Sequence, residues 1–113
     1  MESRMADLAD AGLQLLDRDG AWLPVETEPT NLIVDSGDML ARMTGGLIPA
    51  TTHRVVNPAG PNVSRYSMPF FMHPTLATSL AVLPSCAGRG PAPAPITAGE
   101  YLQERLKAIG MAT

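Results

Sequence analysis

Three side chains with complementary chemistry lie in the central part of the sequence: the imidazole of His53, the guanidinium of Arg65 and the hydroxyl of Ser67. Residues two apart on an extended strand project from the same face, so Arg65 and Ser67 can point at one ligand, with Phe71 on that side too. An imidazole is a common metal ligand, and an arginine fork beside a hydroxyl suits a carboxylate. Alone, a strand histidine is more often structural, and an arginine more often forms a surface ion pair. If the two strands are neighbours, the three side chains converge on one pocket.

The length and composition indicate one small β-rich domain over residues 1–113. The 113 residues include 45% hydrophobic residues, 11 prolines and 10 glycines, which favours a turn-rich β protein over a helical bundle. The net charge of −3, without a block of basic residues, argues against a nucleic-acid partner. The single cysteine, Cys86, excludes an internal disulfide. With neither a secretory signal pattern nor an apolar run near the roughly 20 residues that span a bilayer, we expect a cytoplasmic protein with no membrane partner.

Short strand patterns separated by turn residues run through most of the chain. Residues 13–16 and 21–25 flank the sequence Asp-Arg-Asp-Gly, in which Asp-Gly favours a tight hairpin. Asp38 can cap a short helix that runs to Met43 and ends at the glycine pair 45–46. Further strands are predicted at residues 31–35, 51–56, 64–73 and 76–83.

The last predicted element is a helix over residues 97–110. Thr97 and Glu100 fit a capping box, in which the threonine caps the helix and the glutamate reaches back. Gly110 supplies a stop signal, and the apolar residues recur at helical spacing at Leu102, Leu106 and Ile109. Many short strands followed by one helix predict a mainly β, jelly-roll type of architecture with a C-terminal α-helix.

These segments resemble the Fe(II)/2-oxoglutarate-dependent dioxygenases, in particular the branch similar to isopenicillin N synthase. The resemblance extends over about residues 12–110. It rests on the following segments, quoted as they stand here: GLQLLDRDG at 12–20, VDSGDML at 34–40, HRV at 53–55, RYS at 65–67 and PFF at 69–71. In a member of this family, the matching segment is the C-terminal part of the catalytic domain, which folds as a double-stranded β-helix. The resemblance therefore implies a partial jelly roll for this chain.

The resemblance also implies a chemistry. In the family, two histidines and one carboxylate hold Fe(II) and leave positions open for the cosubstrate and oxygen. His53 aligns with the third of these ligands, and Arg65 and Ser67 align with the pair that binds the distal carboxylate of 2-oxoglutarate. The implied reaction is the oxidation of a small organic substrate coupled to the decarboxylation of 2-oxoglutarate. Phe71 is a candidate wall of the substrate cavity.

The sequence departs from the family pattern at the other two iron ligands. The family supplies them as His-x-Asp or His-x-Glu, yet the only histidines are His53 and His73, and neither has an acidic residue two positions on. One imidazole does not supply the ligand set that catalytic iron needs. We therefore expect the isolated chain to be inactive. Three interpretations follow: the C-terminal part of a longer oxygenase, a non-catalytic module that binds a carboxylate ligand or a protein, or a half-barrel completed by a second chain.

Overall fold

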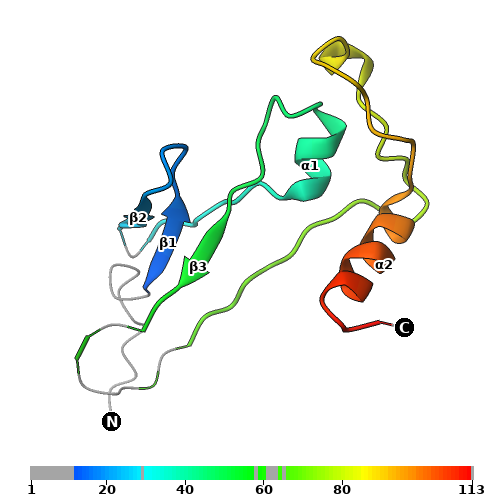
Figure 1. The fold of residues 1–113 in the computed structure, drawn as a ribbon. Coiled ribbons are helices and arrows are strands. Elements are labelled where there is room, and N and C mark those ends of the chain that lie inside the picture. The colour runs from blue at the N-terminus through cyan, green and yellow to red at the C-terminus, as the bar shows by residue number, and fades with distance from the viewer. Residues whose placement is uncertain (1–11, 29, 58, 61–63, 65, 113) are drawn as a thin grey trace. The chain divides into compact units, whose positions relative to one another are not determined.

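The computed structural model describes residues 12–28, 30–57, 59–60, 64 and 66–112. Arg65, predicted to lie on a strand, is outside these residues. The chain divides into two compact units: residues 1–35 with 51–70, and residues 36–50 with 71–113. The first unit contains a small sheet and the second contains the helices (Figure 1).

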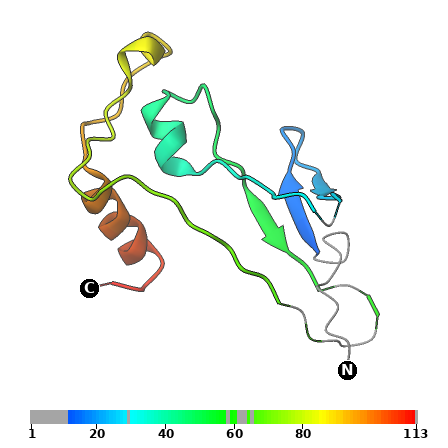
Figure 2. The ribbon, with the colours of Figure 1, turned by 180° about the vertical axis from the view of Figure 1, so that it is seen from behind.

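The sheet of the first unit has three short antiparallel strands. They are β1 (Leu13–Leu16), β2 (Trp22–Pro24) and β3 (His53–Val55), in the order β2-β1-β3. Figure 2 shows this sheet from behind, again with β1 between its two neighbours. The predicted histidine-bearing strand is thus confirmed, although it is shorter than residues 51–56.

The β1–β2 hairpin forms as its turn chemistry predicts. The amide of Asp17 donates to the carbonyl of Ala21 at 2.7 Å, and the amide of Gly20 donates back to the carbonyl of Asp17 at 3.0 Å. Gly20 has a φ of 81°, a left-handed conformation that a residue without Cβ adopts at little cost. The turn therefore fixes the register in which Leu15 pairs with Leu23.

The register divides the sheet into two chemically different faces. Because directly paired residues of antiparallel strands share a face, His53 lies on the same side as its partner Leu15 and as Leu23 beyond it. Gln14 and its partner Arg54 lie on the opposite side. His53 thus projects from the leucine face of the sheet, as alternation along the strand predicts.

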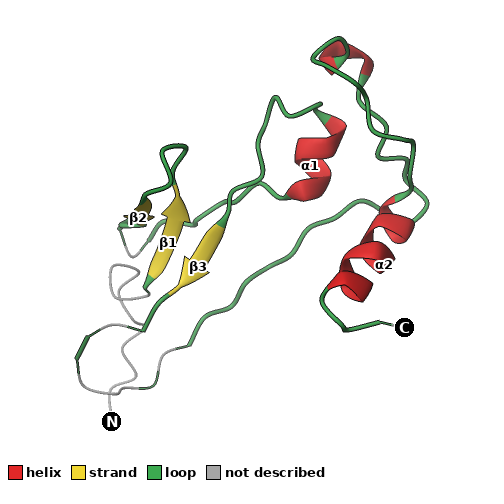
Figure 3. Cartoon of the chain, in the orientation of Figure 1, coloured by secondary structure: helices red, strands yellow, loops and turns green. Residues whose placement is uncertain are grey.

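The second unit contains α1 (Asp38–Met43), α2 (Ala98–Ala108) and a single 3-10 turn, η2 (Pro84–Cys86). Figure 3 shows that most of the described chain between β3 and α2 is loop. Among the described residues of this unit, the buried hydrophobic side chains are Leu80 and Ala98, which are fully buried, and Cys86, which is nearly so; Thr44 is a buried polar residue. Leu80 is held in place because its amide donates to the carbonyl of Ile96 at 2.8 Å, beside an isolated β-bridge between Ser79 and Thr97.

The capping residues predicted from the sequence are found at α2 but not at α1. The capping box of α2 is confirmed, since Thr97 accepts from the Glu100 amide and Glu100 accepts from the Thr97 amide. Gly110 follows α2 with a φ of 75°. At α1 the N-cap residue is Gly37, and Asp38 lies in the first turn without a side-chain cap. Asp38 still suits this position, because a carboxylate is favourable near a helix N-terminus.

The apolar spacing of α2 yields a partly covered stripe. Leu102 and Leu106 are half-buried, whereas Ile109 remains 63% exposed and lies at the C-cap, beyond the last helical residue Ala108. The stripe therefore packs along the first two turns of the helix and not along its end.

Three predicted strands are wrong for the described residues. Residues 31–35, the described residues of 64–73, and residues 76–83 form no strand, apart from the single bridge at Ser79. Leu32 and Val34 have β-favouring composition but are 91% and 92% exposed. A strand forms only where a neighbouring strand pairs with its backbone and packs against its side chains. In the described part of the chain that condition is met only at β1, β2 and β3.

The resulting fold class is a small antiparallel sheet with a C-terminal helix. The predicted partial jelly roll with a C-terminal helix is thus confirmed for the antiparallel sheet and the helix, and the described residues do not form a full double-stranded β-helix. Among those residues, none of the helices has the length and apolar character needed to cross a bilayer.

Candidate functional site

His53 is held by two oxygen atoms at the same ring nitrogen. Its Nδ1 atom lies 3.1 Å from Oδ2 of Asp35 and 3.0 Å from the carbonyl oxygen of Thr51. All three residues belong to the first unit. The imidazole is 49% exposed and Asp35 is 37% exposed, so the group lies at the surface of the leucine face.

This arrangement determines which ring nitrogen is available to a ligand. A backbone carbonyl can only accept a hydrogen bond, so Nδ1 must carry the proton that it donates to the Thr51 carbonyl, with the Asp35 carboxylate beside it. In the neutral ring the Nε2 atom then keeps its lone pair. A metal-binding histidine ordinarily donates its second nitrogen to a carbonyl or carboxylate in this way. The geometry around His53 therefore fits a histidine that binds a metal through Nε2.

The remaining predicted site residues are less fully placed. Arg65 lies outside the described residues. Ser67 is exposed, lies outside the strands, and forms no hydrogen bond with another residue of the described part of the chain. Phe71 is 85% exposed. The convergence of Arg65 and Ser67 with His53 therefore stays a prediction.

His73, the second histidine, lies in a loop and not in the strand predicted over residues 64–73. It is exposed, and its Nδ1 atom lies 2.8 Å from the carbonyl oxygen of Pro74. Within the described ranges, no three residues among histidine, cysteine, aspartate and glutamate come together as a metal site. The described residues thus fit one ligand of an iron site, His53, and do not form a complete set.

The sheet face opposite His53 carries an ordered polar cluster that sequence analysis missed. The guanidinium of Arg54 lies 4.0 Å from the centroid of the Trp22 ring, and its Nε atom donates to Oε1 of Gln14 at 2.8 Å. Alternation along β3 places Arg54 opposite His53, but only the register of three strands brings Gln14 and Trp22 beside it. This cluster holds β3 against its neighbours and so fixes the strand that carries His53.

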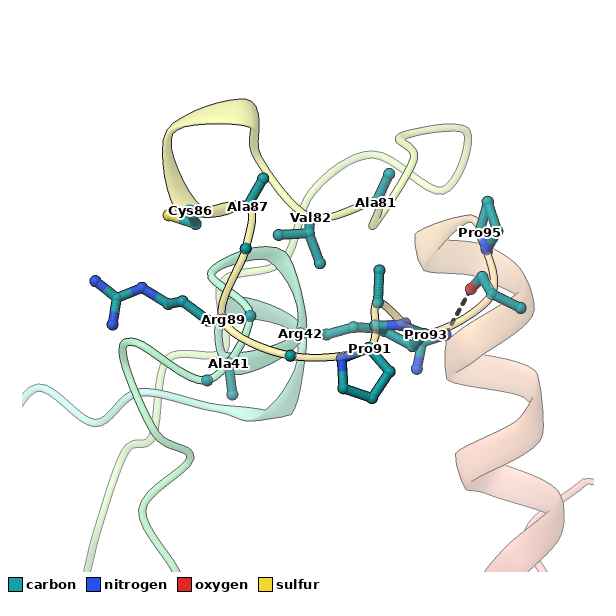
Figure 4. Close-up of a pocket in the computed structure, with 16 residues that line it drawn as sticks. Ala41, Arg42, Ala81, Val82, Cys86, Ala87, Arg89, Pro91, Pro93 and Pro95 are labelled. Atoms are coloured by element: carbon teal, nitrogen blue, oxygen red, sulfur yellow. Dashed lines mark hydrogen bonds between the residues drawn. The ribbon is translucent and has the colours of Figure 1, made fainter.

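The second unit contains a cavity of about 610 Å³ beside α1 (Figure 4). Its wall is mostly alanine, glycine and proline from residues 81–95, with Arg42 of α1 running across it. The Nη2 atom of Arg42 donates to the carbonyl of Ala94 at 2.8 Å, and its guanidinium lies 5.6 Å from the centre of the Tyr101 ring. Arg42 therefore connects α1 to the proline-rich segment and to α2.

A family model described as the 2OG-Fe(II) oxygenase superfamily matches residues 4–74. The chain belongs to this superfamily. Its members take Fe(II) as cofactor and 2-oxoglutarate as cosubstrate, as the resemblance implied. The matched region includes His53 and the residues around it.

Relatives with known roles agree with this assignment. A gibberellin 2-beta-dioxygenase of Phaseolus coccineus is 38% identical over 80 residues, which are 71% of this chain and 24% of that protein. A 2-oxoglutarate-Fe(II) type oxidoreductase, hxnY, of Emericella nidulans is 35% identical over 99 residues, 85% of this chain and 28% of that protein. This chain thus spans about a quarter of the length of these relatives.

Solved structures give the same result for the fold. A 2OG-Fe(II) oxygenase family protein from Caulobacter crescentus is 45% identical, with a TM-score of 0.80 over 87% of this chain and 34% of that chain. A full-length protein of Neurospora crassa, solved in complex with alpha-KG, is 22% identical, with a TM-score of 0.69 over 88% of this chain and 32% of that chain. The second likeness concerns the fold alone. The small sheet and the C-terminal helix thus correspond to about a third of each larger protein.

Proposed function

We propose that this chain supplies the cosubstrate-binding part of an Fe(II)/2-oxoglutarate-dependent oxygenase of the isopenicillin N synthase-like branch, acting on a small organic substrate. His53 binds iron through Nε2, and Arg65 and Ser67 bind the distal carboxylate of 2-oxoglutarate. The observation that carries the proposal is the engagement of His53 Nδ1 by Asp35 and Thr51, which leaves Nε2 free. The match of residues 4–74 to the superfamily supports it.

The roles of the three residues follow from what each side chain offers: a lone pair to a metal, or hydrogen-bond donors to a carboxylate. A neutral imidazole offers one lone pair to a metal, and a guanidinium offers two parallel N–H groups to a carboxylate. The Ser67 hydroxyl adds a third donor to the same anion, so the cosubstrate is oriented by its far end. Fe(II), when bound, activates oxygen for the coupled oxidation of cosubstrate and substrate. The residues of this chain supply the position and orientation of both groups.

A complete iron site needs two ligands that the family supplies as His-x-Asp or His-x-Glu, and the sequence contains neither motif. We therefore expect no turnover from this chain alone when it is supplied with Fe(II), ascorbate and 2-oxoglutarate. Succinate formation is the measurement. Turnover at an ordinary enzymatic rate of about 1 s⁻¹ or more would contradict this expectation. Completion of the barrel by further polypeptide, in this or a second chain, would supply the missing ligands.

The cosubstrate site is tested by thermal unfolding with and without 2-oxoglutarate. A ligand at 100 times its dissociation constant stabilises the folded state by about 2.7 kcal/mol, which raises Tm by about 10 °C in a protein of this size. Arg65→Ala should abolish this protection. Arg18→Ala, which removes an exposed arginine of the hairpin turn, is the matched control and should retain it. Equal protection in both variants would refute the role of Arg65.

The iron ligand is tested by anaerobic titration with Fe(II), followed by calorimetry. His53→Ala should weaken binding by about tenfold or more, since removing even the hydrogen-bonded support of a ligand has such an effect. His73→Ala removes the other imidazole and should leave the affinity unchanged. Equal losses in both variants would mean that the metal binds histidines without selectivity, and the proposal would fail.

A further inference from the structure

The contact between Asp35 and His53 joins two segments that are well separated in the sequence. Asp35 ends an extended loop, and His53 begins β3, yet the carboxylate oxygen lies 3.1 Å from Nδ1 of the ring. The only other group at this nitrogen within the described residues is the Thr51 carbonyl, at 3.0 Å. The carbonyl accepts the hydrogen bond, and the negative charge of the carboxylate 3.1 Å away adds an electrostatic preference for a proton on Nδ1.

We infer that Asp35 is a positioning residue that holds the His53 ring in the Nδ1–H tautomer and directs Nε2 toward the metal. This inference rests on the proposed role of His53 as an iron ligand and adds to it the residue that prepares the ring. Asp35 acts through the imidazole and does not itself touch the metal. The two ring nitrogens point in divergent directions, so a carboxylate that lies against Nδ1 cannot share the metal bound at Nε2.

The Thr51 carbonyl alone does not provide the same control. Thr51 is only two residues from His53 in the sequence, so its carbonyl moves together with the segment that carries the ring. Asp35 reaches the ring from another segment and restrains it from a second direction. With the carboxylate removed, the half-exposed ring can turn and protonate at Nε2, which is the nitrogen that a metal needs unprotonated.

The experiment observes the tautomer directly and needs no iron. Long-range ¹H–¹⁵N spectra of the labelled chain, recorded about two pH units above the ordinary histidine pKa of about 6.5, distinguish Nδ1–H from Nε2–H rings. The variant His73→Gln assigns the two sets of signals. The wild-type chain should show His53 mainly as Nδ1–H. Asp35→Ala should convert most of this population to Nε2–H, whereas Asp35→Asn, which keeps an oxygen acceptor, should restore much of the Nδ1–H form.

Two controls separate positioning from a loss of structure. Asp19→Ala removes an exposed carboxylate in the hairpin turn and should leave the His53 signals unchanged. The His73 signals should stay the same in every aspartate variant, since that ring bonds to Pro74. The backbone spectra of the Asp35 variants should overlay those of the wild-type chain outside the neighbourhood of His53. An Asp35→Asn variant that folds but shows the same loss of the Nδ1–H form as Asp35→Ala would contradict the inference.

The outcomes also distinguish this inference from the proposed function. If Asp35→Ala leaves His53 as Nδ1–H, the Thr51 carbonyl suffices and the inference is overturned, even where His53→Ala abolishes Fe(II) binding. If the tautomer depends on Asp35 but neither histidine variant changes Fe(II) binding, the positioning role stands and the iron role fails.

Discussion

The Arg54 guanidinium lies over the Trp22 ring, 4.0 Å from its centroid, and spans from β3 across β1 to β2. The intervening strand contributes Gln14, whose side-chain oxygen accepts a hydrogen bond from Nε of Arg54 at 2.8 Å. Each of the three strands thus supplies one member of this cluster. Because His53 lies on the same strand as Arg54, the cluster stabilises the backbone that carries the His53 ring.

Replacing Arg54 with alanine should loosen β3 and expose Trp22 to water. The lost cation–π contact and hydrogen bond together predict a cost of about 1–2 kcal/mol in the free energy of unfolding. Trp22 is the single tryptophan, so its fluorescence reports the change directly. We expect a red-shifted emission maximum and a lower urea midpoint for Arg54→Ala, and a smaller effect for Arg54→Lys. Arg18→Ala is the control, and equal shifts in both alanine variants would contradict the prediction.

Gly12 should be the least replaceable glycine of the sheet. Its φ is 70°, and a Cβ atom there would collide with the carbonyl oxygen of Val56, whose amide donates to the Gly12 carbonyl at 2.9 Å. Gly20 has a similar φ of 81° but open space around it. Both alanine variants lose about 1–2 kcal/mol to the left-handed conformation. Gly12→Ala should lose about 1–3 kcal/mol more from the collision, as measured by urea unfolding. Equal losses at both positions would show that the collision is relieved without cost.

The apolar side chains of residues 66–70 should cause self-association. Tyr66, Met68 and Phe70 are 84%, 96% and 87% exposed in a segment that forms no strand. Adjacent exposed apolar groups ordinarily mark an interaction surface. Sedimentation velocity should show concentration-dependent association, and the double variant Met68→Glu, Phe70→Glu should reduce it. A chain that stays monomeric at high concentration would exclude this surface as the cause.

Features set by local chemistry could be predicted from the sequence. The Asp-Gly turn before Ala21 and the capping box of Thr97 and Glu100 each depend on a few adjacent residues, and both formed as expected. His53 was placed correctly on a strand, and the alternation that puts its neighbour Arg54 on the opposite face is also local.

Features set by distant partners could not be predicted in the same way. Residues 31–35 have the composition of a strand, but composition does not say whether a second strand lies beside them, and Leu32 and Val34 remain exposed. The approach of Asp35 to His53 was missed for the same reason, since it depends on the path of the chain between them, which includes α1. The sequence did contain one signal for this contact: the acidic residue Asp35 ends an apolar run and precedes the strand that carries His53.

The threonine of the capping box should contribute measurably to the stability of α2. Its Oγ1 atom accepts from the amide of Glu100 at 3.2 Å, which satisfies one of the free N–H groups of the first turn. Thr97→Ala should lower the free energy of unfolding by about 1 kcal/mol, whereas Thr97→Ser keeps the acceptor and should lose much less. Helicity measured by circular dichroism during urea unfolding compares the two. A serine variant as unstable as the alanine variant would assign the effect to the methyl group and not to the cap.

The same box should make α2 sensitive to acid. The Thr97 amide, at 2.8 Å, and then its hydroxyl, at 2.9 Å, donate to the Glu100 carboxylate and hold its pKa below the ordinary value. A carboxyl group with a lowered folded-state pKa stabilises the fold above its ordinary pKa of about 4.3, and this stabilisation is lost as the pH falls through the folded-state value. We therefore expect Glu100→Ala to be less stable than wild type at pH 7 and to converge with it below about pH 4. Glu104→Ala, on the same helix, is the control and should show no such convergence. A stability difference between Glu100→Ala and wild type that is constant from pH 7 to pH 3 would contradict the prediction.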